Sequence, residues 1–385
     1  MRTSPDVVVV GAGAVGCAIA FHLADAGARV VLVEREAIAS GASTHATGFL
    51  SLAATDFQSE PYFLLGLEGF RATRAIVPRL VELTGIDLLY QLRPGLRLAL
   101  DEEEERFIRD HLAWQERHIA VRWIDGDEVR AIEPRLSPEV RGAAYEAEAA
   151  QLDSARYTLA LATAAERRGA ALLLRRVLGL VREDDRATAI EHQSGRLACG
   201  AVVLALGPWA PVAAPWLGMP IPVRPLKGER LQLRLDGPPL PALVSSPKRG
   251  SLISRRDGFL SVGSTAGRVL EDTEPYLLDE VAADHLDVRP TEAARDELLG
   301  RALEVIPVAA EARLVLHLAG VRPLSPDRWP LVGRVPAWQN VYLATGHGHR
   351  GIHLAAITGQ IVADLVLRGT TDVPVALDRL APGRF

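Results

Sequence analysis

Cysteine and lysine are both scarce in this chain of 385 residues. The cysteines are Cys17 and Cys199, which lie far apart and form no CxxC pair, and the lysines are Lys227 and Lys248. We therefore expect neither a disulfide framework nor a structural zinc site, and we predict no metal site. A reducing, cytoplasmic location fits this cysteine usage best.

Long apolar runs and a targeting segment are missing as well. No uninterrupted apolar run reaches about 18 residues, so the sequence predicts no membrane span. The N-terminus lacks the charged start and the cleavage site of a signal peptide. The net charge of −5 creates no field that would attract nucleic acid or an anionic membrane. The length and the 48% apolar content suit a soluble, globular protein of two packed domains.

Residues 6–34 have the pattern of a dinucleotide-binding βαβ unit. The unbroken apolar run at 7–10 predicts a strand buried on both faces, and it leads into a GxGxxG turn, a helix and a second strand. Gly11 makes the tight turn, Gly13 lets the backbone approach a pyrophosphate, and Gly16 lets the helix pack against the strand.

Two further features of this unit would contact a bound dinucleotide. The helix N-terminus, at Ala14 and Val15, directs free N–H groups at the phosphates. Glu34 ends the second strand, and its carboxylate can accept hydrogen bonds from ribose hydroxyls. The motif by itself does not separate FAD from NAD.

The segment after Glu34 favours FAD. Residues 35–48 are rich in Ser, Thr and Gly. They resemble the loop that runs past the pyrophosphate towards the isoalloxazine ring in flavoproteins of the D-amino acid oxidase and glycine oxidase superfamily. Four further stretches resemble family segments in the same order: 151–177, 201–209, 221–229 and 320–352.

The resemblance implies many FAD contacts beyond the opening motif. They are Arg35, Ala42, Ser43, Thr44, His45, Thr47, Gly48, Phe49, Val177, Gly207, Trp209, Gly346, His347, Gly348, Gly351 and Ile352. The glycine-rich turn at 346–351 opens the last predicted helix. The positive end of that helix dipole would stabilise the anionic reduced flavin.

The implied fold is α/β, with a Rossmann-type FAD-binding domain and an interleaved antiparallel-sheet substrate domain. The FAD-binding domain is predicted from 1–85, 145–222 and 320–385, and the substrate-binding domain from 86–144 and 223–319. Alternating apolar residues at 96–100, 230–235 and 259–263 are typical of half-buried antiparallel strands. The glutamates at 102–105 are interpreted as a solvated helix face rather than a metal site.

Arg322 is the leading candidate for binding a substrate carboxylate. The resemblance places it at the family's carboxylate-binding arginine, and a guanidinium offers a bidentate fork; the alternative is a structural ion pair. His349 and Arg350 lie where the family has a further substrate residue, and register favours His349 whereas charge favours Arg350. Ser251 replaces a family tyrosine, which predicts a wider pocket and puts glycine itself in doubt as the substrate.

His45 leaves two interpretations open. The run 43–48 resembles the segment of dimethylglycine and sarcosine dehydrogenases in which a histidine is joined covalently to the flavin 8α carbon, although one residue before the histidine is missing. Such a tether would raise the flavin potential. The other interpretation is a histidine that is hydrogen-bonded near the pyrophosphate.

The resemblance implies an amine or amino-acid oxidoreductase similar to glycine oxidase. A hydride would pass from the Cα or N-alkyl carbon of a small amino acid to flavin N5, and the electrons would go on to O2. The rival is a dehydrogenase of D-amino acids, sarcosine or dimethylglycine that passes electrons to a quinone or a partner protein. The Gly-His-Gly turn at 346–348 and His45 favour it. A tRNA-modifying flavoprotein domain is a third hypothesis, which the acidic charge opposes. The sequence leaves a homo-oligomer open.

Overall fold

Six strands form the first of two large sheets. In the computed structural model, which describes residues 4–55, 57–268, 270, 272–278 and 286–385, they are β1 (Val7–Val10), β2 (Val30–Glu34), β7 (Ala171–Leu174), β11 (Ala201–Leu204), β17 (Leu331–Arg334) and β18 (Val341–Thr345). Their order is β17-β18-β11-β1-β2-β7, and every neighbouring pair is parallel except β17 with β18. β1 is buried along its whole length, as its valine run predicts.

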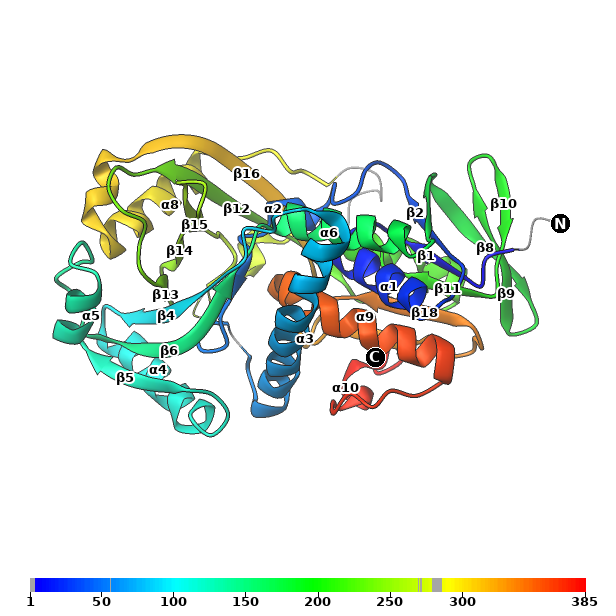
Figure 1. Cartoon of the computed structure of the whole chain (residues 1–385), viewed down its shortest axis with the longest axis horizontal. Coiled ribbons are helices and arrows are strands. Elements are labelled where there is room, and N and C mark those ends of the chain that lie inside the picture. Colours follow the sequence, from blue (N-terminus) through cyan, green and yellow to red (C-terminus); the bar gives the residue numbers. More distant parts are fainter. Residues whose placement is uncertain (1–3, 56, 269, 271, 279–285) are drawn as a thin grey trace.

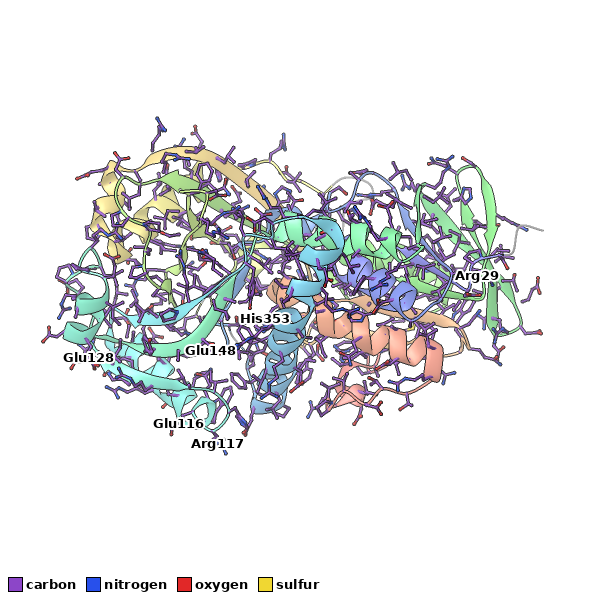
Figure 2. All side chains as sticks on the ribbon, viewed as in Figure 1. Arg29, Glu116, Arg117, Glu128, Glu148 and His353 are labelled. Carbon is purple, nitrogen blue, oxygen red and sulfur yellow. The ribbon has the colours of Figure 1, made fainter. Side chains whose placement is uncertain are left out.

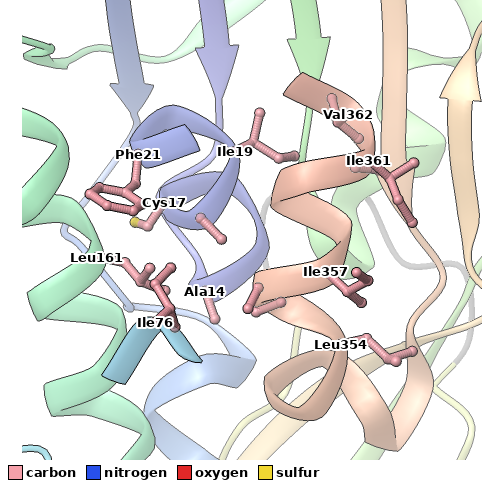
Figure 3. Packing of buried hydrophobic residues seen from close by; sticks show 14 of the residues in the cluster. Ala14, Cys17, Ile19, Phe21, Ile76, Leu161, Leu354, Ile357, Ile361 and Val362 are labelled. Atoms are coloured by element: carbon pink, nitrogen blue, oxygen red, sulfur yellow. The ribbon is translucent and has the colours of Figure 1, made fainter. Parts of the chain in front are cut away.

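The two faces of this sheet are covered by different elements. Val7 and Val9 belong to a core cluster that is built largely by α1 (Ala14–Asp25), α3 (Glu60–Thr84), α6 (Ser154–Arg167) and α9 (Gly351–Arg368). Figure 3 shows Ile19 of α1 on the side that faces α9. Val8 and Val10 belong to a second cluster, beside a small sheet of β8 (Val177–Glu183), β9 (Arg186–His192) and β10 (Gly195–Ala198).

The last long helix, α9, has the length and hydropathy of a membrane-spanning helix over Gly348–Arg368. However, 67% of its apolar window is buried inside the protein. Leu354 and Ile357 of α9 lie in the first core cluster together with residues of α1 (Figure 3). Packing within the protein therefore accounts for the apolar character of this helix.

A second, mainly antiparallel sheet forms the other half of the molecule (Figure 1). Its strands in spatial order are β16 (Arg313–Leu324), β12 (Arg224–Arg234), β15 (Leu260–Gly263), β14 (Gly250–Ser254), β13 (Leu243–Ser246), β4 (Gln91–Ala99), β6 (Gly142–Gln151) and β3 (Phe49–Leu50), with β5 (Val121–Asp125) paired to β6. The helices at this end are α4 (Glu102–Gln115), α5 (Gly126–Ile132) and α8 (Glu292–Val305) (Figure 1). β12 and β16 run from this end to the centre of the molecule, which brings their residues to the first sheet (Figure 1).

Short helical elements complete the described secondary structure. They are α2 (Ala42–His45), α7 (Ala214–Leu217) and α10 (Leu377–Leu380), and the 3-10 turns η1 (Gly207–Ala213), η2 (Glu274–Tyr276), η3 (Pro307–Glu311) and η4 (Gly348–Arg350).

The α/β fold with two interleaved halves agrees with the prediction, but the antiparallel sheet extends past the predicted boundaries. β6 continues to Gln151 and β16 to Leu324, so 145–151 and 320–324 pair within this sheet. β3 also pairs with β6, although it lies within the segment 1–85. The boundary shifts because single continuous strands reach from one half of the molecule to the other.

The expected solvated face at 102–105 is confirmed for Glu102 and Glu103, which are exposed, but it is wrong for Glu104. Glu104 is fully buried, and its carboxylate accepts hydrogen bonds from the Leu100 N–H at 2.8 Å and the Lys248 N–H at 2.9 Å. Arg249 pairs with the same carboxylate at 2.8 Å. Glu104 thus joins α4 to the loop after β13, because an acidic group at a buried helix position is stable when donors surround it.

Candidate active site

A cavity of about 470 Å³ runs between the two sheets. It begins at the turn between β1 and α1, passes α2 and η4, and ends against residues of the antiparallel sheet. Its first part lies beyond the carboxyl ends of parallel strands, which is where open α/β sheets bind ligands.

Glycines keep the end of the cavity next to α1 open. A Cβ on Gly16 would come within 1.9 Å of the Gly11 carbonyl oxygen, and one on Gly11 (φ 106°) within 2.4 Å of the Ala205 carbonyl oxygen. No side chain fits at either position, so the backbone of this turn borders the cavity directly. Ser43 lies opposite, where its Oγ accepts a hydrogen bond from the Ala14 N–H at 2.9 Å. The N-terminus of α1 therefore forms one wall and directs its positive dipole end and the N–H groups after Ala14 at the cavity, where an anion would be favoured.

Glu34 reaches the cavity from the end of β2. Its carboxylate accepts a hydrogen bond from the Ala12 N–H at 2.8 Å and another from the Glu36 N–H at 3.0 Å. Carboxylate oxygens have further lone pairs, so the same group can also accept from the hydroxyls of a ribose. Arg35 lies over the ring of Trp209, 4.1 Å from its centroid, and both residues line the cavity.

His45, the last residue of α2, lies beside the middle of the cavity. Its side chain packs on Gly320 of β16, where a Cβ would come within 2.6 Å of the His45 Cβ. The His45 carbonyl accepts a hydrogen bond from Arg230 Nε at 2.8 Å. Its Nδ1 is buried and has no hydrogen-bond partner in the described part of the chain. Burial, and then the charge of Arg230, lowers the pKa of the imidazole, which is therefore neutral at pH 7.

Arg322 projects into the cavity from β16. Its Nη2 donates to Ser264 Oγ at 2.6 Å and its Nη1 to the Thr265 carbonyl at 3.3 Å. The guanidinium occupies the space over Gly228 on the neighbouring strand β12, where a Cβ would lie 1.9 Å from Nη1. The absence of a side chain at Gly228 therefore permits this position of Arg322.

The turn before α9 places His349 and Arg350 in the same part of the cavity. His349 Nε2 donates to the Ala266 carbonyl. Burial, together with the charges of Arg322 and Arg350, holds the pKa of His349 well below its usual range, so this imidazole is neutral. Arg350 is 3% exposed, and its guanidinium lies 4.8 Å from the ring centroid of Tyr62. The structure thus places both candidates for the further substrate residue, His349 and Arg350, at the cavity.

Two buried histidines hold this turn in place. His347 Nε2 lies 3.1 Å from Thr358 Oγ1, and His353 Nε2 donates to the Gly66 carbonyl of α3 at 2.8 Å. Burial lowers the pKa of both imidazoles to about 4. Figure 2 shows His353 at the centre of the molecule, whereas labelled charged residues such as Glu128 lie at its edge. The two neutral rings therefore link η4 and α9 to the protein core.

Comparison with known proteins identifies the family. A family model described as FAD dependent oxidoreductase (DAO) matches residues 6–365. The chain belongs to this DAO family. It is 31% identical over 373 residues to a glycine oxidase of Geobacillus kaustophilus, covering 96% of this chain and 95% of the relative. It is also 31% identical over 366 residues to a glycine oxidase of Pseudomonas aeruginosa, covering 94% and 95%. The crystal structure of glycine oxidase from Geobacillus kaustophilus matches with a TM-score of 0.90 at 30% identity, covering 100% of each chain.

The protein is thus an FAD-dependent oxidoreductase of the DAO family, and the cavity fits this cofactor. The turn at Gly11 to Gly16 leaves room for a pyrophosphate beside the N-terminus of α1, because a Cβ at either glycine would collide with backbone. Glu34 is placed at the end of β2, where a ribose would lie. Beyond these groups the cavity continues to Arg322, which leaves space for a substrate.

Most residues that the sequence predicts for the site of this DAO-family protein line the cavity. They are Gly11, Gly13, Ala14, Val15, Gly16, Glu34, Arg35, Ala42, Ser43, His45, Thr47, Gly48, Phe49, Val177, Gly207, Trp209, Ser251, Arg322, His347, Gly348, His349, Arg350, Gly351 and Ile352. Thr44 and Gly346 are not part of the lining. The Thr44 hydroxyl donates to the Ala39 carbonyl at 2.7 Å, and Gly346 adopts a φ of 74° that shapes the turn after β18.

Several lining residues were not predicted from the sequence. They are mostly polar residues of the antiparallel sheet and its loops: Arg97, Gly228, Arg230, Ser245, Ser246, Ser264, Arg268 and Arg328. The sequence contained a signal for two of these residues. Arg97 lies within an alternating apolar run and Arg230 begins one, so each places a charge in a predicted strand. The serines gave no such signal.

Proposed function

We propose that this DAO-family protein is an oxidase of amino acids, similar in reaction to the glycine oxidases among its relatives. The observation that carries the proposal is the position of Arg322, which Ser264 and Thr265 hold at the substrate end of the cavity. A guanidinium can bind a carboxylate through two parallel hydrogen bonds, which fixes both the place and the orientation of the substrate.

The residues around Arg322 also suit an amine. His349 is neutral, so it adds a polar contact without a second charge, and the positive charges of Arg322 and Arg350 favour the neutral form of a nearby substrate nitrogen. The chemistry that FAD supplies when bound is removal of a hydride from the carbon next to that nitrogen and transfer of two electrons to O2, which gives H2O2. Water then hydrolyses the imine product.

Oxygen uptake and peroxide release test this proposal. With a bound amino-acid substrate, we expect H2O2 equimolar with the oxygen consumed. Reduction of an artificial electron acceptor without oxygen uptake would contradict the oxidase and favour the dehydrogenase alternative. No reduction of the flavin by any amino acid would contradict both.

Gly228→Ala is expected to displace Arg322 and leave the fold intact. The added Cβ would collide with the Arg322 guanidinium, the far end of a flexible side chain, rather than with backbone. Because a misplacement of about 1 Å can cost on the order of 100-fold in rate, we expect kcat/KM for amino acids to fall about 100-fold. Steady-state kinetics measure this loss.

The matched control for Gly228→Ala is Gly300→Ala. Gly300 lies in α8, and a Cβ there would meet nothing within 4 Å. We expect unchanged kcat/KM and a slightly higher Tm in this variant, because Ala favours helix more than Gly does. Normal kcat/KM in Gly228→Ala, with normal flavin content, would show that activity does not require the Arg322 guanidinium to lie over Gly228.

We infer that FAD is held without a covalent bond to His45. The His45 side chain is packed against Gly320. The run 43–48 also lacks one residue before the histidine relative to the dehydrogenase segment that it resembles. After denaturation in acid, the yellow colour should leave the precipitated chain. Colour that stays with the chain, and that is lost in His45→Ala, would establish the covalent link instead.

A further inference from the structure

A row of polar side chains crosses the antiparallel sheet beyond Arg322. Ser251 of β14 pairs in register with Ser245 of β13, which pairs with Arg97 of β4. Directly opposite residues project to the same face of a sheet, and all three line the cavity. Their exposed fractions are 9%, 6% and 3%. These three residues are called the polar row below.

Ser245 in the polar row lacks a partner. Its Oγ is buried and makes no hydrogen bond within the described part of the chain. An unsatisfied buried hydroxyl is unfavourable, and a ligand atom at this place would supply the missing hydrogen bond. The neighbours Leu96, Val244 and Leu252 face the opposite side of the sheet and form its apolar core. Polar character is therefore confined to the cavity side, where a ligand would lie.

Arg97 brings a positive charge to this end of the cavity. Its Nη1 donates to the Ala53 carbonyl at 2.5 Å, and its guanidinium lies 5.1 Å from the ring centroid of Phe107. Its charge acts on Glu146, which also accepts from Ser51 Oγ at 2.5 Å. Burial raises the pKa of Glu146 to about 7. The five N–H donors of a guanidinium can serve Ala53 and a ligand together.

The spacing between Arg322 and Arg97 limits the size of the ligand. Arg322 is held by Ser264, which directly follows β15, and three strand steps lead from β15 through β14 and β13 to β4. At about 4.8 Å per step the backbones of β15 and β4 are roughly 14 Å apart. The Arg322 guanidinium already lies at the β15 end of this distance, against Ser264. A molecule with two carboxylates separated by a few carbon atoms would reach both guanidiniums. Ser251 lies on β14 between them, and its short side chain leaves the passage open.

We propose that Arg97 and Ser245 bind a second carboxylate of the substrate, so that this enzyme oxidises an amino dicarboxylate in preference to an amino acid with an uncharged side chain. The inference rests on the proposed function, because Arg322 must hold the first carboxylate. An arginine only donates hydrogen bonds and a serine hydroxyl can donate, so together they match an acceptor group with negative charge.

Reduction of the flavin in the holoenzyme tests the inference with four probes. D-Glutamate and iminodiacetate carry two carboxylates, D-glutamine replaces one by a neutral amide, and D-norvaline replaces it by an apolar group. We expect the better dicarboxylate to show a kcat/KM at least 100-fold above that of D-norvaline, with D-glutamine in between. Equal values for D-norvaline and both dicarboxylates would overturn the inference and leave the amino-acid oxidase standing. No reduction by any amino acid would overturn the proposed function itself.

Variants of the polar row test whether its residues cause the preference for dicarboxylates. Ser245→Ala removes only the unpartnered hydroxyl, and we expect it to lower the ratio of dicarboxylate to D-norvaline kcat/KM about 10-fold. Arg97→Met should lower the same ratio more than 100-fold, but it also leaves Glu146 without its charge partner. If Arg97→Met fails to fold, the ratio measured in Ser245→Ala still tests the role of the polar row.

Ser254→Ala is the matched control for Ser245→Ala. Ser254 is a buried serine of the same sheet, on β14, and it lies outside the cavity lining. Its removal should leave the ratio unchanged. An unchanged ratio in Ser245→Ala, or an equal fall in both serine variants, would overturn the role of the polar row.

Discussion

Arg322→Met is expected to lower kcat/KM for amino-acid substrates about 1,000-fold while FAD stays bound. Removing one partner of a buried, hydrogen-bonded charge pair costs about 2–5 kcal/mol. The substrate carboxylate is present before and during hydride removal, so most of the loss should appear in KM and the rest in kcat through poorer alignment. Steady-state kinetics with the best substrate give the two parts separately.

Two further variants are compared with Arg322→Met: the conservative variant Arg322→Lys and the control Arg313→Met. Lysine keeps the charge but not the planar fork, so Arg322→Lys should recover activity only in part. Arg313 is exposed at the start of the same strand β16, and its replacement by Met should leave kcat/KM unchanged. An Arg322→Met enzyme with normal KM would show that Arg322 is a structural residue and that another group holds the carboxylate.

Glu34→Ala is expected to weaken FAD binding by at least 100-fold. The carboxylate receives the Ala12 and Glu36 N–H groups, so its loss frees two backbone donors as well as the acceptor for the ribose. Hydrogen bonds to a charged group contribute about 1.5–3 kcal/mol each, and the loss of two or more is therefore large. Titration of apoprotein with FAD, followed by quenching of flavin fluorescence, measures the dissociation constant.

Glu36→Ala is the control for Glu34→Ala. The Glu36 side chain is 61% exposed and pairs with Arg35 at 3.4 Å, whereas only its backbone N–H contacts Glu34. We expect nearly unchanged FAD affinity in this variant, since an exposed ion pair contributes little. Equal losses in both variants would mean that the charge of this loop, rather than the Glu34 carboxylate, governs binding.

The cofactor end of the site was predictable because its parts are close together in the sequence. Gly11, Gly16 and Glu34 lie within one βαβ unit, where strand, turn and helix fix their mutual positions through local geometry. The structure places all three at the cavity, as predicted. Local pattern could not show that Thr44 donates to a loop carbonyl instead of lining the cavity, because the direction of one side chain depends on its packing.

The substrate end was predicted only where the family resemblance supplied a residue. Arg322 came from the resemblance, but its partner Gly228 lies on another strand and became visible only through the pairing of β12 with β16. Glu104 illustrates the same limit. An acidic run at a helix start predicts exposure, whereas contact with Arg249 buries this one member of the run.

The sequence by itself determined the family, FAD as the cofactor and Arg322 as the candidate carboxylate site. The tertiary structure alone decided what surrounds Arg322. Arg97, Ser245 and Ser251 come from separate strands, and only the register of β4, β13 and β14 aligns them on one face. Register depends on contacts between distant segments, so no local pattern encodes it. The polarity of the substrate pocket is therefore a property of strand pairing rather than of any single motif.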